Sequence, residues 1–462
     1  MNDSEIFDVI IVGAGLTGLA TATYLVKEGM KVLVLEKNDR VGGQINTFNE
    51  NGFVFESGPN TGTISNYEVV ELFDLLKERV QLVKACENSQ KRLIWKKKQF
   101  YPLPSGLVSA ICTPLFKWTD KFNVLLEPFV KKGSNPNETI GELAYRRLGK
   151  SFFDYAVDPF VSGIFAGDPM KLVTKYALPK LYNLEQTYGS FIKGALKKSM
   201  QKKTLQEKAT TKEVFSVSGG LSNLIYAMND FIGEENIVKN VSHISIQPSK
   251  DNVWIVEYEC DGYYYKVNAN NIVTTTCAYQ LREYMSFISE DDVICLESIE
   301  YSDVVQVPVA IKNDNKSIYN AFGGLIPSKE KKDILGILFP SKCFDKDQRA
   351  PEGYDLLSVF LGGVKNPKYI DMPDEVIIKI VEDNIVEMMK SDINDFSILK
   401  IFRHKNAIPQ YEDNTGIRIS CIDKLEKRYK GLYLRGNMVG GIGMSERIKQ
   451  AINTAKLIIS DI

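Results

Sequence analysis

The chain has 462 residues, with 57 basic and 58 acidic side chains and a formal net charge of −1. This length exceeds one compact core, so we expect two or three lobes, and the charge balance excludes a protein that holds nucleic acid by bulk positive charge. The only two histidines, His243 and His404, argue against a histidine-ligated metal centre or a histidine-centred triad, and we interpret His404 as structural. Seven cysteines without a C-x-x-C pair are typical of reduced thiols.

The first predicted unit is a strand, a turn, a helix and a second strand. Its parts, in chain order, are strand 8–12, the motif G-x-G-x-x-G at Gly13, Gly15 and Gly18, helix 19–28, strand 31–35 and the acidic Glu36. Gly13 allows the tight turn, Gly15 lets the backbone approach a diphosphate, and Gly18 lets the helix pack closely on the strand. Glu36 can accept hydrogen bonds from ribose hydroxyls. We therefore predict a dinucleotide site; the alternative is a glycine-rich turn without a ligand.

The segment 91–210 is predicted to be mostly helical, and its end is strongly basic. Residues 192–212 contain seven lysines and one glutamate. A basic helix beside apolar helices can lie on an anionic membrane surface, and the alternative is a solvated charged face.

The stretch VSGIFAGDP at 161–169 is predicted to be a loop that combines glycines with apolar side chains. Gly163 and Gly167 would let the backbone approach a large flat ligand, while Ile164 and Phe165 would cover it. A ligand of that shape would have to lie in a cleft between lobes.

The later segments are predicted to supply further strands and one more glycine-rich turn. Alternating runs at 304–311 and 355–363 predict strands, and 374–389 predicts an amphipathic helix that covers one face of their sheet. This lobe could roof a substrate cavity. At the C-terminus, strand 432–434, a glycine-rich turn and helix 445–459 follow each other. The positive end of that helix would stabilise a nearby anion, and the alternative is a simple closing unit.

A resemblance to a known family emerges from motifs along the whole chain. The run E-K-x-x-R-x-G-G at 36–43 is similar to the extended flavin signature of amine-oxidase-like flavoproteins. With the motifs that follow it, the chain resembles the protoporphyrinogen and coproporphyrinogen oxidase family. The motifs, in order, are the flavin fingerprint, ESGPNT, QKRLIWKKKQFYPLPSGL, DPFVSGIFAGDP, GGLIPS, AIPQY and the C-terminal glycine turn. That last turn is richer in glycine than the usual family form.

The resemblance implies an α/β (overall α+β) fold. It consists of a discontinuous Rossmann-like FAD-binding domain with an inserted sheet-based substrate domain and an inserted α-helical, membrane-facing domain. The implied segments are 1–90, 211–290 and 403–462 for the FAD-binding domain, 91–210 for the helical domain and 291–402 for the substrate domain.

The resemblance also implies the site residues. The implied FAD-binding residues are Gly13, Gly15, Leu16, Thr17, Gly18, Glu36, Lys37, Arg40, Gly42, Gly43, Gln44, Gly58, Pro59, Asn60, Thr61, Val241, Gly436, Asn437, Ile442, Gly443 and Met444. The implied substrate-binding residues are Arg92, Gly163, Ile164, Phe165, Gly167, Leu325, Phe360 and Asn60. Arg92 falls at the family's propionate-binding position, whereas Leu325 and Phe360 would sandwich the macrocycle. No protein side chain is assigned a catalytic role, because flavin N5 accepts the hydride, and no metal is expected.

The implied function is an FAD-dependent, six-electron oxidation of protoporphyrinogen IX or coproporphyrinogen III in haem biosynthesis. The alternatives are a phytoene-desaturase-like or amine-oxidising flavoenzyme and a redox-inactive flavin scaffold. Because no second G-x-G-x-x-G motif occurs, we expect electrons to leave to oxygen or a quinone. No apolar run approaches the ~20 residues of a membrane span. We therefore expect a cytoplasmic protein with peripheral contact to the inner membrane face, and transfer of product to a chelatase and a homodimer are compatible with it.

Overall fold

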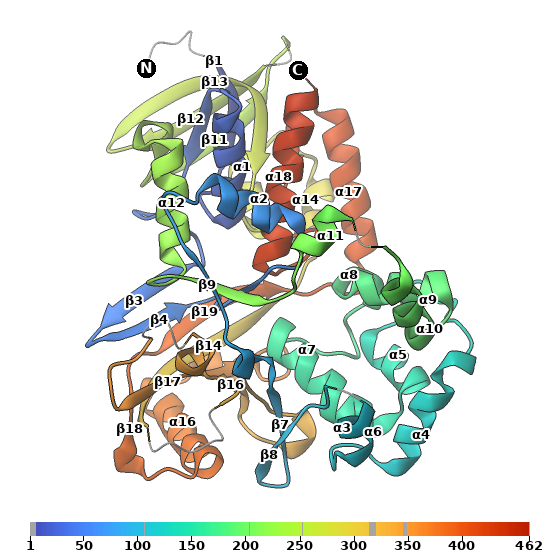
Figure 1. Ribbon diagram of the computed structural model, residues 1–462. Helices are drawn as coiled ribbons and strands as arrows, with labels where there is room; N and C mark the ends of the chain where they lie inside the picture. The colour runs from blue at the N-terminus through green and yellow to red at the C-terminus, as the bar shows by residue number, and fades with distance from the viewer. Residues whose placement is uncertain are drawn as a thin grey trace.

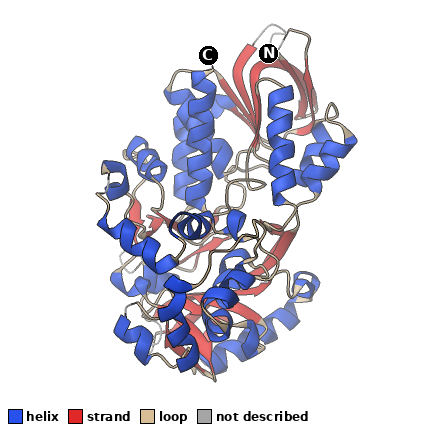
Figure 2. Ribbon diagram, turned by 90° about the vertical axis from the view of Figure 1, so that its right-hand side faces the viewer, coloured by secondary structure: helices blue, strands red, loops and turns tan. Residues whose placement is uncertain are grey.

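The computed structural model describes residues 6–105, 107–202, 204–251, 253–313, 320–344 and 349–461. Figure 1 shows an upper domain that contains both ends of the chain, a second sheet at the lower left and a helical lobe at the lower right. Figure 2 shows helices flanking the upper sheet and the helical lobe lying in front of the second sheet. The fold is thus a mixture of α/β and α+β parts.

The upper domain is built on a seven-stranded sheet to which three distant chain segments contribute. Its strands are β1 (Ile6–Val12), β2 (Val32–Leu35), β10 (Ile237–Val238), β11 (Ser242–Pro248), β12 (Trp254–Cys260), β13 (Tyr263–Thr274) and β20 (Leu432–Leu434). β2, β1, β13 and β20 run parallel, whereas β11 and β12 form an antiparallel hairpin at the edge. The parallel order brings the carboxyl ends of β1, β2 and β20 to one edge of the sheet.

Both faces of the upper sheet are covered, as its continuous apolar strands require. Val9 and Ile11 of β1 face a core shared with α1 (Leu16–Lys27), α2 (Tyr67–Leu75), α12 (Ser222–Ile232) and α18 (Met444–Ser460). The alternate residues, Ile10 and Val12, face α14 (Glu290–Glu297) and α17 (Thr415–Arg428). This alternation fixes the register of the parallel strands.

The second sheet has eight strands. They are β7 (Arg92–Lys96), β8 (Gln99–Pro102), β14 (Tyr301–Lys312), β15 (Gly323–Leu325), β16 (Ile334–Leu338), β17 (Tyr354–Gly362), β18 (Phe396–Ile398) and β19 (Phe402–Pro409). One face packs on α16 (Asp374–Met389), whose apolar stripe includes Ile377, Val381 and Ile385. The other face is turned toward the upper domain and the helical lobe.

Eight short helices make up the helical lobe in the described part of the chain. They are α3 (Leu107–Cys112), α4 (Trp118–Leu126), α5 (Ile140–Arg147), α6 (Lys150–Phe152), α7 (Asp158–Phe165), α8 (Thr174–Ala177), α9 (Pro179–Tyr188) and α10 (Phe191–Met200). The next helix, α11 (Leu205–Ala209), contacts α2 of the upper domain. The fully buried Arg147 pairs with Glu127 and Glu185, which ties α5 to the segments around it. Buried pairs of this kind fix an arrangement more reliably than they add stability.

Short pieces join the domains. The hairpin of β3 (Asn46–Glu50) and β4 (Phe53–Ser57) leaves the upper domain and packs on the second sheet. A three-stranded sheet of β5 (Gly62–Thr63), β6 (Leu82–Lys84) and β9 (Val214–Val217) lies between them.

Two segments pair with the second sheet although the predicted domain boundaries assign them to other domains. Residues 92–102 were expected in the helical domain, yet β7 pairs with β15 and β8, because the consecutive apolar residues Leu93, Ile94 and Trp95 form a strand that is buried on both faces. Residues 403–409 were expected in the FAD-binding domain, yet β19 pairs with β14 of the second sheet.

Candidate active site

The N-terminal glycine motif is a turn whose glycines do different things. Gly13 has φ +102°, which favours glycine. A methyl group on Gly18 would lie 2.0 Å from the carbonyl oxygen of Gly13, so α1 packs directly on the turn. Gly15 has φ −76°, and a methyl group added to it would meet no protein atom within 4 Å. Neither backbone strain nor packing therefore explains Gly15, and the prediction that a ligand approaches its backbone stays a prediction.

A second glycine turn lies against the first. The amide of Gly42 donates to the carbonyl of Ala14 at 2.8 Å, and a methyl group on Gly43 would lie 3.2 Å from the Cα of Gly15. Arg40 donates to the carbonyls of Gly43 at 2.7 Å and Ile45 at 3.2 Å. The Arg40 guanidinium thus holds this second turn in place.

Glu36 is buried at the end of β2, and its carboxylate is oriented by the first turn. One oxygen accepts from the Ala14 amide at 2.9 Å, and the other accepts from the amide and side chain of Asn38. The Val241 amide donates to the Glu36 carbonyl at 3.0 Å. Glu36 and the Val241 backbone therefore lie together beside the motif.

The Gly58 loop is joined to the second sheet by one buried amide. Gln306 accepts from the Gly58 amide at 2.8 Å and donates to the carbonyl of Glu56 at 2.9 Å. Farther along, the hydroxyl of Ser445 donates to the Thr63 carbonyl, at the start of α18. The Gly58 segment thus contacts both the sheet face and the C-terminal helix.

The C-terminal turn at 436–443 is held from behind by buried side chains. Its successive carbonyls accept hydrogen bonds as follows: Gly436 from Arg447, Asn437 from Tyr411 at 3.0 Å, Met438 from Arg418 at 3.4 Å, and Val439 from Arg447 at 2.8 Å and Gln450 at 2.9 Å. Burial lowers the pKa of both guanidiniums, and it raises the pKa of Tyr411.

These segments fit a dinucleotide cofactor. A methyl group on Gly15 would meet no protein atom, the Glu36 carboxylate is bonded to the first turn, and Gly443 precedes α18 without a side-chain cap. The Nε of the buried Arg447 and the Oδ1 of Asn437 have no partner within the described residues.

An apolar row of residues crosses the sheet face that is turned toward the Gly58 loop. The cross-strand register places Leu325, Gly336 and Phe360 side by side on β15, β16 and β17, with Gln306 of β14 next in line. Gly336 has no side chain, and a methyl group on it would lie 3.4 Å from the Leu325 side chain. Leu325 and Phe360 therefore lie on one surface near the predicted flavin loop.

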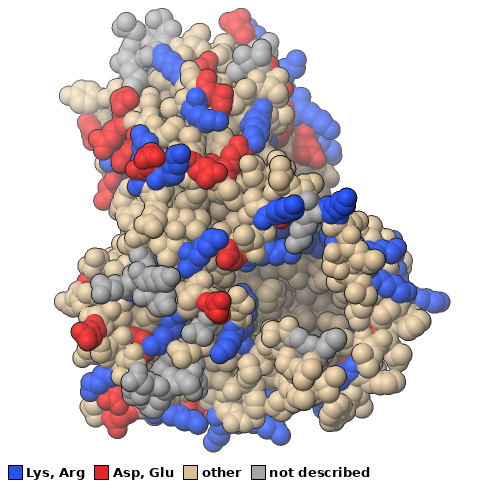
Figure 3. All heavy atoms as spheres, viewed as in Figure 1, with Lys and Arg blue, Asp and Glu red and all other residues tan. Residues whose placement is uncertain are grey.

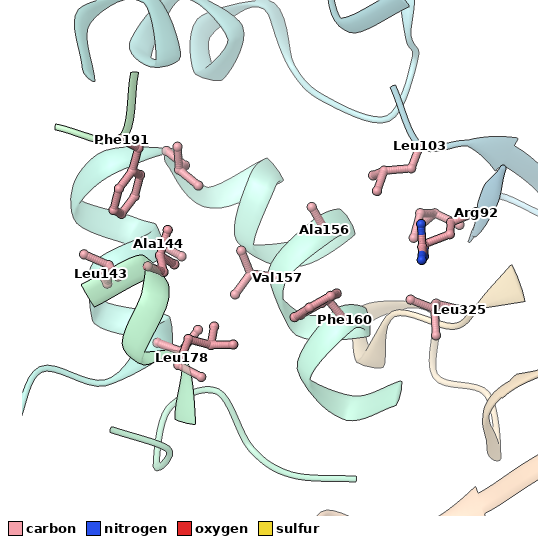
Figure 4. Close-up of a pocket in the computed structure, with 14 residues that line it drawn as sticks. Arg92, Leu103, Leu143, Ala144, Ala156, Val157, Phe160, Leu178, Phe191 and Leu325 are labelled. Atoms are coloured by element: carbon pink, nitrogen blue, oxygen red, sulfur yellow. The ribbon is translucent and has the colours of Figure 1, made fainter. Parts of the chain in front are cut away.

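A pocket of about 260 Å³ opens from this surface into the helical lobe. It is lined by Arg92, Ile94, Leu103, Ile140, Leu143, Ala144, Leu148, Ala156, Val157, Phe160, Leu178, Leu181, Phe191 and Leu325. Figure 4 shows Arg92 and Leu325 at one end, Leu143 and Phe191 at the other and Phe160 between them. Figure 3 shows a wide hollow between the lobes with lysine and arginine side chains at its rim. Arg92 is thus the one charged residue in an otherwise apolar lining, as far as the described residues show.

The predicted loop at 161–169 is mostly helix. α7 begins at Asp158, where Pro159 suits the first helical turn, and it continues to Phe165. Ala166, with φ +47°, ends the helix. Gly163 contacts Leu325, since a methyl group there would lie 2.4 Å from that side chain. Ile164 is exposed, whereas Phe165 is buried and packs with Ile140 and Tyr411. The predicted contact of these two side chains with a ligand stays a prediction.

The other predicted residues lie near the turns. Leu16 and Thr17 are buried in the first turn of α1, and Met444 is buried at the start of α18. The remaining positions, which are half-buried or exposed around the three glycine segments, are Lys37, Gln44, Pro59, Asn60, Thr61 and Ile442. Gly167 contacts Gln410 at the end of α7.

Sequence reasoning missed the side chains that support the site. Gln306 follows a strand pattern, and Arg447 falls within an amphipathic helix, so neither carries a local signal. The sequence signal for Gln306 is that it is a polar residue within the apolar run of β14. No cluster of three or more potential metal ligands occurs among the described residues.

Comparison with known proteins identifies the family. The family model for flavin containing amine oxidoreductase matches residues 16–459. The chain belongs to this family. This flavoprotein is therefore an oxidoreductase, and the prediction of FAD as its cofactor is confirmed.

Named relatives cover nearly the whole flavoprotein. A mitochondrial protoporphyrinogen oxidase from Nicotiana tabacum is 29% identical over 98% of this chain and 94% of its own. A coproporphyrinogen III oxidase from Bacillus subtilis (strain 168) is 25% identical over 98% of this chain and 97% of its own. A crystal structure assigned as a protoporphyrinogen oxidase from Exiguobacterium sp. 255-15 superposes with a TM-score of 0.79, at 20% identity, over 98% of this chain and 99% of the other. The predicted resemblance to this group is confirmed.

Proposed function

We propose that this flavoprotein oxidises a porphyrinogen to the porphyrin in haem biosynthesis, with dioxygen as the electron acceptor. The observation that carries the proposal is the apolar pocket with Arg92 at one end, next to the sheet face that meets the Gly58 loop. The substrate loses six electrons and six protons in three two-electron steps, and three dioxygen molecules become hydrogen peroxide. Relatives named for both porphyrinogens support the substrate class.

Bound FAD supplies the acceptor for each electron pair, and the protein supplies position. Arg92 is the first residue of β7, and its guanidinium carbon lies 5.2 Å from the centre of the Phe322 ring. No carboxylate of the described chain pairs with it, so its planar donors are available for a propionate. Leu325 and Phe360 give this sheet face an apolar surface that suits a flat ring system. The chemistry needs orientation more than a strong base.

The pocket favours protoporphyrinogen IX over coproporphyrinogen III. The two substrates differ in carrying vinyl or propionate groups, and each propionate needs a cation or water. Arg92 is the one cation in the lining, and the rest of the described lining is apolar. A substrate with vinyl groups therefore leaves fewer charges without a partner.

Kinetics with both substrates test the role of Arg92. Arg92→Ala removes binding that is made equally before and during hydride loss, so KM should rise about tenfold or more with little change in kcat. Arg92→Lys should recover part of the affinity, because the charge returns without the planar fork. Lys91→Ala, which removes an exposed charge from the preceding residue, is the matched control and should behave as wild type.

A collapse of kcat with unchanged KM in Arg92→Ala would contradict the anchoring role. Oxidation of primary amines with no reaction of either porphyrinogen would remove the proposed function itself. A higher kcat/KM for coproporphyrinogen III would overturn the preference for vinyl groups while leaving the reaction class intact.

The helical lobe is proposed as the membrane-facing part. Trp118 and Phe122 of α4 are 71% and 61% exposed, and Phe129 just beyond it is 81% exposed. On α10 the apolar Met200 lies near the exposed Lys197. Apolar side chains with adjacent lysines suit the surface of an anionic bilayer. No helix in the described residues is long and apolar enough to cross a bilayer.

Co-sedimentation with vesicles that contain anionic lipid tests this contact. The double variant Trp118→Ser/Phe122→Ser should bind vesicles several-fold less tightly, because each side chain contributes buried apolar area. Equal binding by wild type and variant would show that this surface is not the contact. The predicted homodimer and the transfer of product to a chelatase stay predictions.

A further inference from the structure

The peptide groups of the C-terminal turn are oriented by the side chains behind it. In a trans peptide the carbonyl of one residue and the amide of the next point in opposite directions, and the described backbone has no cis bonds. Because the carbonyls of Gly436 to Val439 each accept a hydrogen bond from a side chain, the amides of residues 437–440 each point away from that side chain. Within the described residues no acceptor bonds these amides. The turn therefore carries four amides that are free to bind an anion.

The same turn carries buried positive charge with little compensation. Arg447 is 7% exposed, its Nε lacks a partner, and no carboxylate of the described chain lies within ion-pair distance of it. Arg418 is fully buried and donates to Asn414, Thr415 and Met438 rather than to an acid. Glu446 is the acidic neighbour, and its carboxylate lies over Gly443. Neither buried guanidinium therefore forms an ion pair with a carboxylate of the described residues.

We propose that Arg447 is a positioning residue that sets the reduction potential of the bound flavin. It holds the turn with its amides free and adds a positive charge near them, and both effects favour the reduced, anionic cofactor over the oxidised, neutral ring. The inference rests on the proposed function only in that FAD occupies the site. It would make the flavin a stronger acceptor for each electron pair.

Potentials of matched variants test the role of Arg447. Arg447→Gln keeps a hydrogen-bond donor and loses the charge, Arg447→Lys keeps the charge, and Lys449→Gln removes an exposed charge from the same helix. The two-electron potential is measured against a reference dye, and the affinity for oxidised FAD is measured by titration. In Arg447→Gln, the affinity for reduced FAD relative to the affinity for oxidised FAD should fall about tenfold. For a two-electron couple this lowers the reduction potential by about 30 mV. Arg447→Lys should retain most of the wild-type potential, and Lys449→Gln all of it.

A merely structural role gives a different result. Weaker FAD binding with an unchanged potential in Arg447→Gln would overturn the inference, because both redox forms would then lose affinity equally. If Arg447→Gln does not fold, Arg418→Gln removes the second guanidinium behind the turn, and an unchanged potential there overturns it as well. These measurements use no porphyrinogen. Failure of wild type to bind FAD would instead count against the proposed function.

Discussion

The two ends of the chain each contribute a glycine-rich turn that leads into a helix, yet the two turns are supported differently. The N-terminal turn is held largely by close backbone packing of α1 on Gly13 through Gly18, with hydrogen bonds from Thr275 and to Glu36 beside it. The carbonyls of the C-terminal turn are held by side chains, namely Arg447 of the helix that follows it and the more distant Arg418 and Tyr411. The two turns therefore differ in how far they depend on side chains.

This difference predicts where each turn is vulnerable. A larger side chain at Gly18 should distort the N-terminal turn, because no space is free beside that residue. The C-terminal turn should instead lose its conformation when a side chain that bonds its carbonyls is shortened.

The largest effect is expected at Gly18. In Gly18→Ala the new methyl group would lie 2.0 Å from the Gly13 carbonyl oxygen, and backbone must move to relieve the contact. We expect the free energy of unfolding to fall by about 3 kcal/mol or more, with loss of FAD, as judged by urea unfolding and flavin absorbance.

Gly15→Ala is the matched variant, since its methyl group meets no protein atom. We expect the apoprotein to unfold within about 1 kcal/mol of wild type. FAD affinity should nevertheless fall at least about tenfold, which is 1.4 kcal/mol. Unimpaired FAD binding in Gly15→Ala would show that the diphosphate does not approach this turn.

This contrast also explains how much of the molecule the sequence predicts. The strand–turn–helix unit at Gly13 and the helix 374–389 depend on neighbouring residues, so periodicity and glycine spacing were sufficient. Arg447 and Gln306 act on segments 8 or more positions away, and their partners become visible only when strands and turns meet. Residues 92–102 were misplaced for the same reason, because β7 finds its partner β15 more than 200 residues later.

A smaller effect is expected at Tyr411. Its hydroxyl donates to the Asn437 carbonyl and accepts from the Gly441 amide at 3.1 Å. Tyr411→Phe leaves both groups without that partner, which costs about 1–3 kcal/mol in the free energy of unfolding at pH 7. FAD affinity should fall by a comparable amount in titrations. Full stability and full affinity in this variant would mean that the turn does not depend on support from behind.

The smallest effect concerns alkaline pH. Burial raises the pKa of Tyr411 above the value of about 10 for an unfolded tyrosine. The stability that a raised tyrosine pKa contributes is fully present below pH 10, and it is lost as the pH rises toward the pKa of the folded protein. The stability difference between wild type and Tyr411→Phe should therefore narrow as pH rises above 10 in urea unfolding. A constant difference over this range would contradict the burial of the hydroxyl.

We propose that both turns hold one FAD whose ring oxidises a porphyrinogen bound at Arg92. Anaerobic mixing of the FAD-loaded protein with protoporphyrinogen IX, followed by flavin absorbance and porphyrin fluorescence, is the direct test. We expect loss of flavin absorbance on substrate addition, and porphyrin formation with full recovery of the absorbance when dioxygen is admitted. A protein that takes up no FAD, or whose bound FAD stays oxidised in excess porphyrinogen, would contradict it.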